Sequence, residues 1–219
     1  MGLNCGCPAG AHLADLTVAD CKESLGQLQK VVFQRLFSAA GTRNTISNPK
    51  AKASWTSVLS AADGTKGIVS PYIQNPATTP GAARTFGGGN QTLGGVEIVI
   101  GREPTAFTGV IYQELQSTIA TMKEYQCEEV GIYLIDENGN IGCIAETTTS
   151  GSTTTTNYYP IPIRKLFIGD KNLGGFEEPD SNAIEWSFLP NWSDKLVILK
   201  RSELDFDPLT ELVNIASQG

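Results

Sequence analysis

Residues 105–146 decide the fold, and they read TAFTGVIYQELQSTIATMKEYQCEEVGIYLIDENGNIGCIAE. In the first half of this stretch, apolar residues recur every three or four positions, the spacing of one helix face. They are Phe107, Ile111, Leu115, Ile119 and Met122. Pro104 and Thr105 suit the start of a helix, because the missing N–H of proline is harmless there. The spacing predicts one amphipathic helix that lies on a sheet.

The second half of the stretch has the period of two that is typical of a strand. Its alternating apolar residues are Ile132, Leu134, Ile141, Cys143 and Ala145. Asn138-Gly139 stands between the two runs and is a strong hairpin signal, because both residue types tolerate positive φ. We therefore predict a hairpin with Asn138 and Gly139 in its turn. Asp136 and its acidic neighbour fit a solvated structural turn better than a calcium loop, since Ile141 stands where that loop needs glycine.

The flanking regions predict the domain organisation. Residues 1–16 have no period and are interpreted as an extended N-terminal arm, followed by one β-rich domain over 17–219. Long loops are expected near 38–53, 75–95 and 146–157, which are rich in Gly, Thr, Ser or Pro. The last of these is also compatible with a solvated pair of strand ends.

Shorter elements are predicted around this core. A helix should begin at Thr17, and residues 26–37 are either a strand or the continuation of that helix, with the strand favoured. The remaining predictions are a helix capped by Ser54, an edge strand at 68–73, a strand at 96–100, an edge strand at 158–168 that contains two prolines, a hairpin formed by 184–188 and 196–198, and a terminal helix within 205–219.

Composition limits the possible functions. The chain has 219 residues, of which 18% are charged, below the usual fraction of about 25%. A surface covered by neighbouring subunits and a β-rich protein with neutral loops both explain this. The net charge is −7: residues 1–110 hold nine basic and six acidic residues, and residues 111–219 hold seven and seventeen. Such asymmetry suits head-to-tail self-association, although chance clustering explains it equally, and an acidic chain is a poor nucleic-acid binder.

Residues that could carry chemistry are few. The five cysteines do not form a disulfide framework, and Cys5, Cys7, Cys21 and the single histidine, His12, lack the spacing of a zinc site. One histidine excludes most catalytic triads. We expect no enzyme activity, no cofactor and no bound metal. We also expect no signal peptide and no membrane span, and therefore a protein kept in a reducing cytoplasm.

Two segments carry a resemblance to known proteins. Ile184-Glu-Trp-Ser-Phe188, with the preceding Gly174-Gly175 turn, resembles the late strand of the tail tube proteins of tailed bacteriophages. Asp20-Cys-Lys-Glu-Ser-Leu-Gly-Gln-Leu-Gln-Lys30 is similar to structural proteins from phages of gut Bacteroidetes. The order of elements, with one helix across a sheet and a long Gly/Thr-rich loop, extends the resemblance over most of the chain, whereas the Cys-rich arm departs from it.

The resemblance implies an α+β, mainly β fold: a β-sandwich or partly closed barrel, with one flanking helix and short terminal helices. It implies a virion structural protein of the tail, assembled in the host cytoplasm into six-fold rings that stack into a tube. Its partners would be itself and other tail or head proteins, and DNA would pass without specific binding. The alternatives are a capsid-decorating or head–tail connector protein, and a ligand-binding β-domain.

The charge asymmetry adds a hypothesis about the stacked rings. Carboxylates of residues 111–219 would face the channel and repel DNA slightly, and basic side chains would mark the contacts between rings. These predicted contact residues are Arg43, Lys50, Lys52, Lys66 and Arg84.

Overall fold

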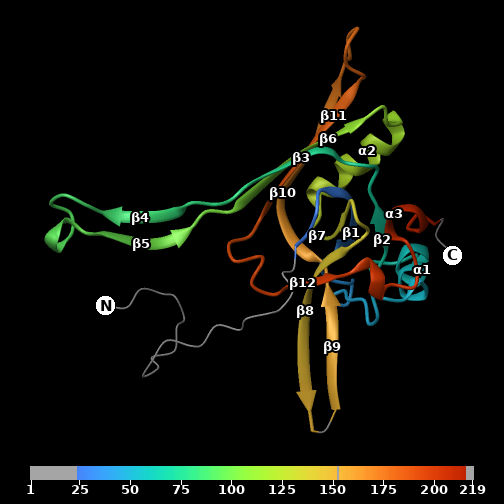
Figure 1. Cartoon of the computed structure of the whole chain (residues 1–219), viewed down its shortest axis with the longest axis horizontal. Helices are drawn as coiled ribbons and strands as arrows, with labels where there is room; N and C mark the ends of the chain where they lie inside the picture. The colour runs from blue at the N-terminus through green and yellow to red at the C-terminus, as the bar shows by residue number, and fades with distance from the viewer. Residues whose placement is uncertain (1–23, 152, 216–219) are drawn as a thin grey trace.

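The computed structural model describes residues 24–151 and 153–215, and in this part of the chain the fold is mainly β (Figure 1). The predicted arm 1–16 and the helix start at Thr17 lie outside the described residues, as do the Cys5, Cys7, His12 and Cys21 group. The strands are β1 (Leu28–Arg35), β2 (Gly67–Val69), β3 (Gln74–Thr79), β4 (Ala83–Gly87), β5 (Glu97–Arg102), β6 (Thr105–Tyr112), β7 (Val130–Asp136), β8 (Ile141–Ser150), β9 (Thr153–Tyr159), β10 (Ile161–Asn172), β11 (Ser181–Phe188) and β12 (Leu196–Leu199). The α-helices are α1 (Lys52–Ser60), α2 (Gln116–Glu124) and α3 (Pro208–Glu211), and single 3₁₀ turns are η1 (Leu93–Gly95), η2 (Tyr125–Cys127) and η3 (Arg201–Glu203).

Ten of these strands form one antiparallel sheet. Its main path runs β12-β8-β7-β10-β11-β6-β3, with β1 and β2 branching from β7, and β9 pairing with β8. The remaining pair, β4 and β5, forms a separate two-stranded sheet. The predicted mainly-β class is confirmed, and the large sheet is not closed into a barrel.

Both faces of the central sheet are buried. Along β7, Ile132 and Leu134 join one hydrophobic cluster, which α2 covers with Ile119 and Met122. Tyr133 and Ile135 join a second cluster on the opposite face. Helix α1 and the C-terminal segment cover this face with five large side chains: Trp55, Leu59, Leu204, Phe206 and Leu212. Side chains of β7 thus alternate between two faces of the sheet, as the sequence predicted, but both faces are apolar because β7 is a central strand.

The predicted hairpin turn is confirmed, with a different geometry. Gly139 has φ +75°, and its N–H donates to the Asp136 carbonyl at 3.0 Å, whereas Asn138 is not among the residues with positive φ. The interpretation of Asp136 as solvated is wrong, because this side chain is fully buried. Its Oδ1 accepts the N–H groups of Asn138 and Asn140 at 2.9 and 2.8 Å, and its Oδ2 accepts the Asn140 amide and the Gly26 N–H at 2.8 Å each.

The helix predicted from residue 105 is wrong in its first half. Residues 105–112 form strand β6, which pairs along its whole length with β11, and only Gln116–Glu124 is helical. Phe107 and Ile111 are four positions apart, a spacing that brings two residues to the same side of either a helix or a strand. Both are buried, and Leu115, predicted to lie on the same face, is 70% exposed.

The loop predicted near 75–95 is wrong for about half of its length, because it contains β3 and β4. The loop predicted near 146–157 is instead a ribbon of β8 and β9 with a turn at its tip, the alternative of paired strand ends. Residues 38–51 are irregular, as predicted. Sequence periodicity did not indicate β3 and β4, since neither strand buries one face regularly.

Several strand partners also differ from expectation. The strand β1 is confirmed for the ambiguous 26–37 segment, and β2 and β5 form where strands were predicted. The strand predicted at 158–168 is confirmed from residue 161 onward by β10, but its predicted edge position is wrong, because β10 pairs with β7 and then with β11. Pro162 lies where β10 changes partner. The hairpin predicted for 184–198 is wrong as well, since β11 pairs with β6 and β10 while β12 pairs with β8.

The predicted helices near the ends of the domain are partly confirmed. Helix α1 forms with Trp55 and Leu59 buried, but it begins after Ala51 without the expected Ser54 cap. The terminal helix is a single turn, α3, which Asp207 caps by accepting the Leu209 N–H.

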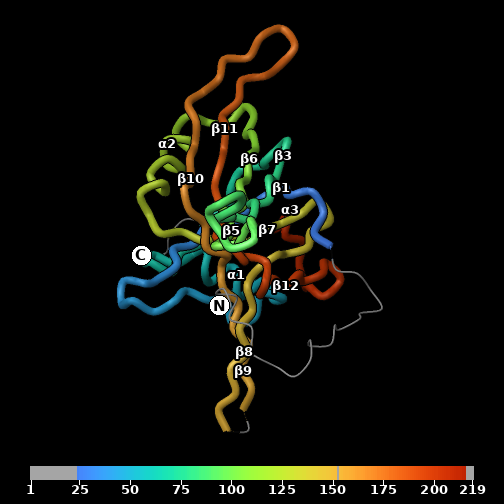
Figure 2. The backbone as a smooth tube through the Cα atoms, turned by 90° about the vertical axis from the view of Figure 1, so that its left-hand side faces the viewer, coloured from blue at the N-terminus to red at the C-terminus, as the bar shows by residue number. Residues whose placement is uncertain are grey.

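Three β-ribbons extend from the body in different directions (Figure 1). The β4–β5 ribbon leaves to one side, the β8–β9 ribbon runs the opposite way from the end of β10–β11, and in Figure 2 the β4–β5 ribbon points towards the reader. Each of the three ribbons is therefore a separate candidate surface for contact with other molecules.

Candidate functional site

The β4–β5 ribbon (83–102) is called the arm from this point on and is distinct from the predicted N-terminal arm at 1–16. It continues two strands of the body. Strand β3 continues into β4, and β5 returns into β6, while the Glu103 N–H donates to the Ala82 carbonyl at 2.9 Å where the arm leaves the body. A Cβ added to Gly81 would lie 1.9 Å from the Glu103 carbonyl oxygen, so only glycine fits this position. The direction of the arm is therefore fixed by backbone packing at its root.

The arm exposes apolar side chains that nothing in the described chain covers. Its large exposed residues are Phe86 (55% exposed), Leu93 (102%), Val96 (63%), Val99 (51%) and Ile100 (56%). A two-stranded ribbon is marginally stable in water by itself, and large exposed apolar side chains gathered on one element are candidates for contact with another molecule. The arm thus exposes apolar area that contact with another molecule would remove from water.

The tip of the arm is held in one conformation by its own hydrogen bonds. The Thr92 hydroxyl accepts the Gly88 N–H at 3.2 Å and donates to the Val96 carbonyl at 2.6 Å. The glycines on either side of Thr92 take positive φ, which residues with a side chain rarely adopt; they are Gly87, Gly88, Gly89, Gly94 and Gly95. Leu93 is presented at the end of this preformed turn.

The β8–β9 ribbon has the opposite surface chemistry. Cross-strand hydroxyl pairs lie 3.0 Å apart at Thr147 and Thr156, and 3.3 Å apart at Thr149 and Thr154. From 147 to 157 the ribbon carries no charged and no large apolar residue. These hydroxyl pairs satisfy each other across the ribbon, and residues 147–157 hold no large apolar side chain that needs a partner.

An ion-pair cluster holds the root of this second ribbon. The Glu146 carboxylate accepts from Lys195 at 3.1 Å and from Arg43 at 2.9 Å, and the Arg43 guanidinium lies 3.8 Å from the Tyr159 ring centroid. The pKa of Glu146 is lowered below its usual 4.5, mainly by the hydrogen bond from Lys195; desolvation opposes this shift, and the charges of Arg43 and Lys195 add to it.

The turn between β10 and β11 carries the third exposed apolar group. Phe176 and Leu173 are 111% and 81% exposed, and Glu177 and Glu178 follow directly. The Lys171–Asp180 ion pair joins the two strands below this turn. This tip therefore combines apolar side chains with negative charge.

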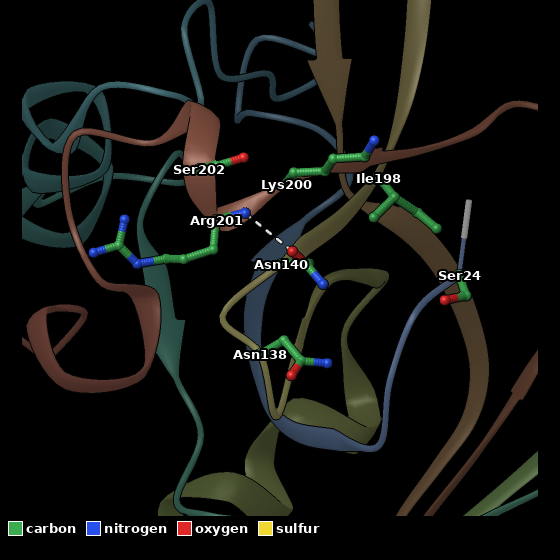
Figure 3. Close-up of a pocket in the computed structure, with 7 residues that line it drawn as sticks. All are labelled: Ser24, Asn138, Asn140, Ile198, Lys200, Arg201 and Ser202. Atoms are coloured by element: carbon green, nitrogen blue, oxygen red, sulfur yellow. Dashed lines mark hydrogen bonds between the residues drawn. The ribbon is translucent and has the colours of Figure 1, made fainter. Parts of the chain in front are cut away.

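Two hollows include residues of the β7–β8 hairpin or of the segment beside its turn. One, of about 390 Å³, is lined by Lys200, Arg201 and polar neighbours (Figure 3). The Arg201 N–H donates to the Asn140 side-chain oxygen at 3.0 Å, but the Lys200 and Arg201 side chains point in different directions, so they do not converge on one anion.

The other hollow, here called the apolar pocket, has a volume of about 380 Å³ and lies between β1, β3 and the end of β11. None of the described residues that line it is charged. Its lining includes Leu28, Pro76, Thr78, Phe107, Phe188 and Trp192. The Phe188 and Trp192 rings stack with centroids 4.2 Å apart, which gives the pocket a rigid aromatic wall.

The five basic residues predicted at ring contacts do not come together in one patch. Lys50 and Lys52 pair with Glu203 and Glu211, each at 2.5 Å, and tie the start of α1 to the C-terminal segment. Arg43 belongs to the Glu146 cluster, Lys66 donates to the Ile215 carbonyl at 3.4 Å, and Arg84 lies on the arm. At least three of the five thus form ion pairs within the chain, and the role of these residues between rings stays a prediction.

Among residues 24–151 and 153–215, no three His, Cys, Asp or Glu side chains are grouped so that they could hold a metal ion. Burial raises the pKa of the Cys143 thiol to about 12, which leaves it protonated and unreactive at neutral pH. No helix in this part of the chain is both long and apolar enough to cross a membrane.

Sequence reasoning predicted β5 but missed β4, its pairing with β5, and the apolar pocket. The arm had one available signal, a set of large apolar residues within a stretch that lacks charge from Thr85 to Val96. The pocket had none, because its lining comes from strands far apart in the chain. Comparison with known proteins adds no relative, since no protein-family model and no curated protein sequence matches this chain.

Proposed function

We propose that this protein is a virion structural protein whose copies assemble into stacked rings that form a phage tail tube, a channel for DNA. The observation that carries the proposal is the arm, which holds five large apolar side chains away from the body with nothing in the described chain to cover them. A neighbouring copy supplies the missing cover, which removes this surface from water.

The other ribbons suit the same assembly. The uncharged β8–β9 ribbon offers hydroxyl groups rather than Lys and Arg, so DNA beside it would not be held by its phosphates. The net charge of −7 also disfavours binding of the negatively charged DNA. In this proposal DNA passes through without specific binding, and the partners are further copies and other tail or head proteins.

Apolar contact supplies most of the binding free energy between copies. Exposed ion pairs contribute about 0–1 kcal/mol each, and three of the five predicted contact cations already have carboxylate partners in their own chain. Salt should therefore loosen the assembly only slightly.

Negative-stain microscopy of the full chain, with light scattering over a range of concentrations, tests the proposal. Tubes or stacked rings are the expected result. Single rings that never stack would indicate a connector instead, and isolated small particles at every concentration would overturn the assembly function and favour a ligand-binding domain.

A further inference from the structure

Two large apolar side chains stand fully exposed at the ends of ribbons, Leu93 on the arm and Phe176 on the β10–β11 turn. The two tips differ in charge. Residues 85–96 contain no ionisable group, whereas Phe176 is followed by Glu177 and Glu178. The surface that receives each tip must match this difference, because burying an unpaired carboxylate is costly.

The apolar pocket matches the arm tip and not the acidic tip. Its described lining contains no charged residue to pair with Glu177 or Glu178. Its aromatic wall of Phe188 and Trp192 offers contacts to an aliphatic side chain such as Leu93. Charge matching therefore selects one tip for this pocket.

We propose that the tip of the arm of one copy inserts Leu93 into the apolar pocket of a second copy. This inference rests on the proposed assembly and names its contact. The arm cannot reach its own pocket, because it leads away from the body where the pocket lies (Figure 1). The tip is braced by Thr92 before binding, so little conformational entropy is lost when it docks.

The proposed contact between Leu93 and the apolar pocket restricts the symmetry of the assembly. Tip and pocket are different surfaces of the same chain, so the interface is heterologous: each copy gives one tip and receives another. Such contacts form a ring when the rotation closes and an open filament when it does not, and they do not stop at a two-fold dimer.

Two complementary variants test the contact. Leu93→Glu places a charge on the tip, where the side chain is 102% exposed and has no packing to lose. Thr78→Glu places a charge at the exposed rim of the pocket, on β3. Each variant alone should lose assembly at concentrations where the unaltered chain is fully assembled, as measured by light scattering after gel filtration.

Mixing the two variants gives the sharper result. The Leu93→Glu chain keeps a working pocket and the Thr78→Glu chain keeps a working tip, so one contact forms and growth then stops. The expected product is a complex of one chain of each kind. Phe176→Glu, an equal change on the other exposed tip, is the matched control and should assemble normally.

The outcomes separate this inference from the proposed function. If the unaltered chain never assembles, the proposed function fails and this contact fails with it. If the unaltered chain assembles and Leu93→Glu does so equally well, only the contact is wrong. Circular dichroism confirms folding of each variant, and a benzophenone cross-linker at position 93 provides a second measurement: it should label the peptide that contains Trp192 of another copy, and labelling confined to other segments would overturn the contact.

Discussion

The β7–β8 hairpin and the arm both end in glycine-containing turns, yet they are stabilised in opposite ways. At the first turn, Asp136 is fully buried and its carboxylate accepts an N–H from Gly26, 110 positions earlier in the chain. At the tip of the arm, Thr92 bonds only to the residues of its own turn. The first turn is part of the body, and the second is an independent projection.

The two turns should therefore respond differently to substitution, one through the stability of the whole protein and the other through assembly. A turn tied to the core opens only when the core opens, whereas a projecting tip opens locally with little effect on the rest. We therefore expect changes at the β7–β8 turn to lower the stability of the whole protein, and changes in the arm to alter assembly alone.

Removal of the arm should have the largest effect. Ala82 and Glu103 already share a hydrogen bond, so an Asn-Gly linker can replace residues 83–102 without strain. We expect complete loss of assembly in light scattering and an unchanged melting temperature. Gln91→Ala, which alters an exposed side chain on the same tip, is the control and should assemble normally. A shortened chain that still formed tubes would show that the arm is not the contact.

Asp136→Asn should destabilise the body most among single substitutions. Each carboxylate oxygen accepts two N–H groups, and an amide would turn its own N–H₂ towards two of these donors. The free energy of unfolding in urea should fall by about 2–3 kcal/mol.

The matched change in the arm is Thr92→Val, which removes the bonds to Gly88 and Val96. It should leave the unfolding midpoint unchanged and speed hydrogen exchange at Gly88. A lowered midpoint would show that the arm is coupled to the core after all.

Gly139→Val should have a smaller effect of about 1–2 kcal/mol, because it forces a β-branched residue to positive φ. The φ of Gly139 is +75°, and a Cβ there would also lie 3.1 Å from the Arg201 side chain. Gly89→Val in the arm tip is the comparison, with φ +54° and no atom within 4 Å of an added Cβ. Thermal melting should respond to the first variant only, and equal shifts would contradict the contrast between the two turns.

Acid should have the smallest effect, at the root of the β8–β9 ribbon. The pKa of Glu146 is lower in the folded protein than its ordinary 4.5, so its contribution is complete above that value and is lost as pH falls through the folded pKa. Urea titrations between pH 7 and pH 3 should show a slight loss of stability in this range. The slope should be shallower in Glu146→Gln, and an identical slope would show that the cluster does not respond to acid.

The amino-acid sequence alone determined the elements whose burial is regular. Alternation predicted β7 and β11, and the Asn-Gly pair located the turn before β8. The same local reasoning was wrong for β6, because the four-residue spacing of Phe107 and Ile111 fits a strand as well as a helix. Pairing with β11 decided between them.

Tertiary structure alone decided the partners and the candidate site. The partner of β12 is β8 rather than the nearby β11, and the apolar pocket joins residues from Leu28 to Trp192. Asp136 is buried because a segment far away in sequence closes over it. The arm has no fully buried face, and its first strand, β4, shows no regular pattern of apolar residues. A local pattern records which side of an element is buried, whereas the identity of what buries it depends on contacts between residues distant in the chain.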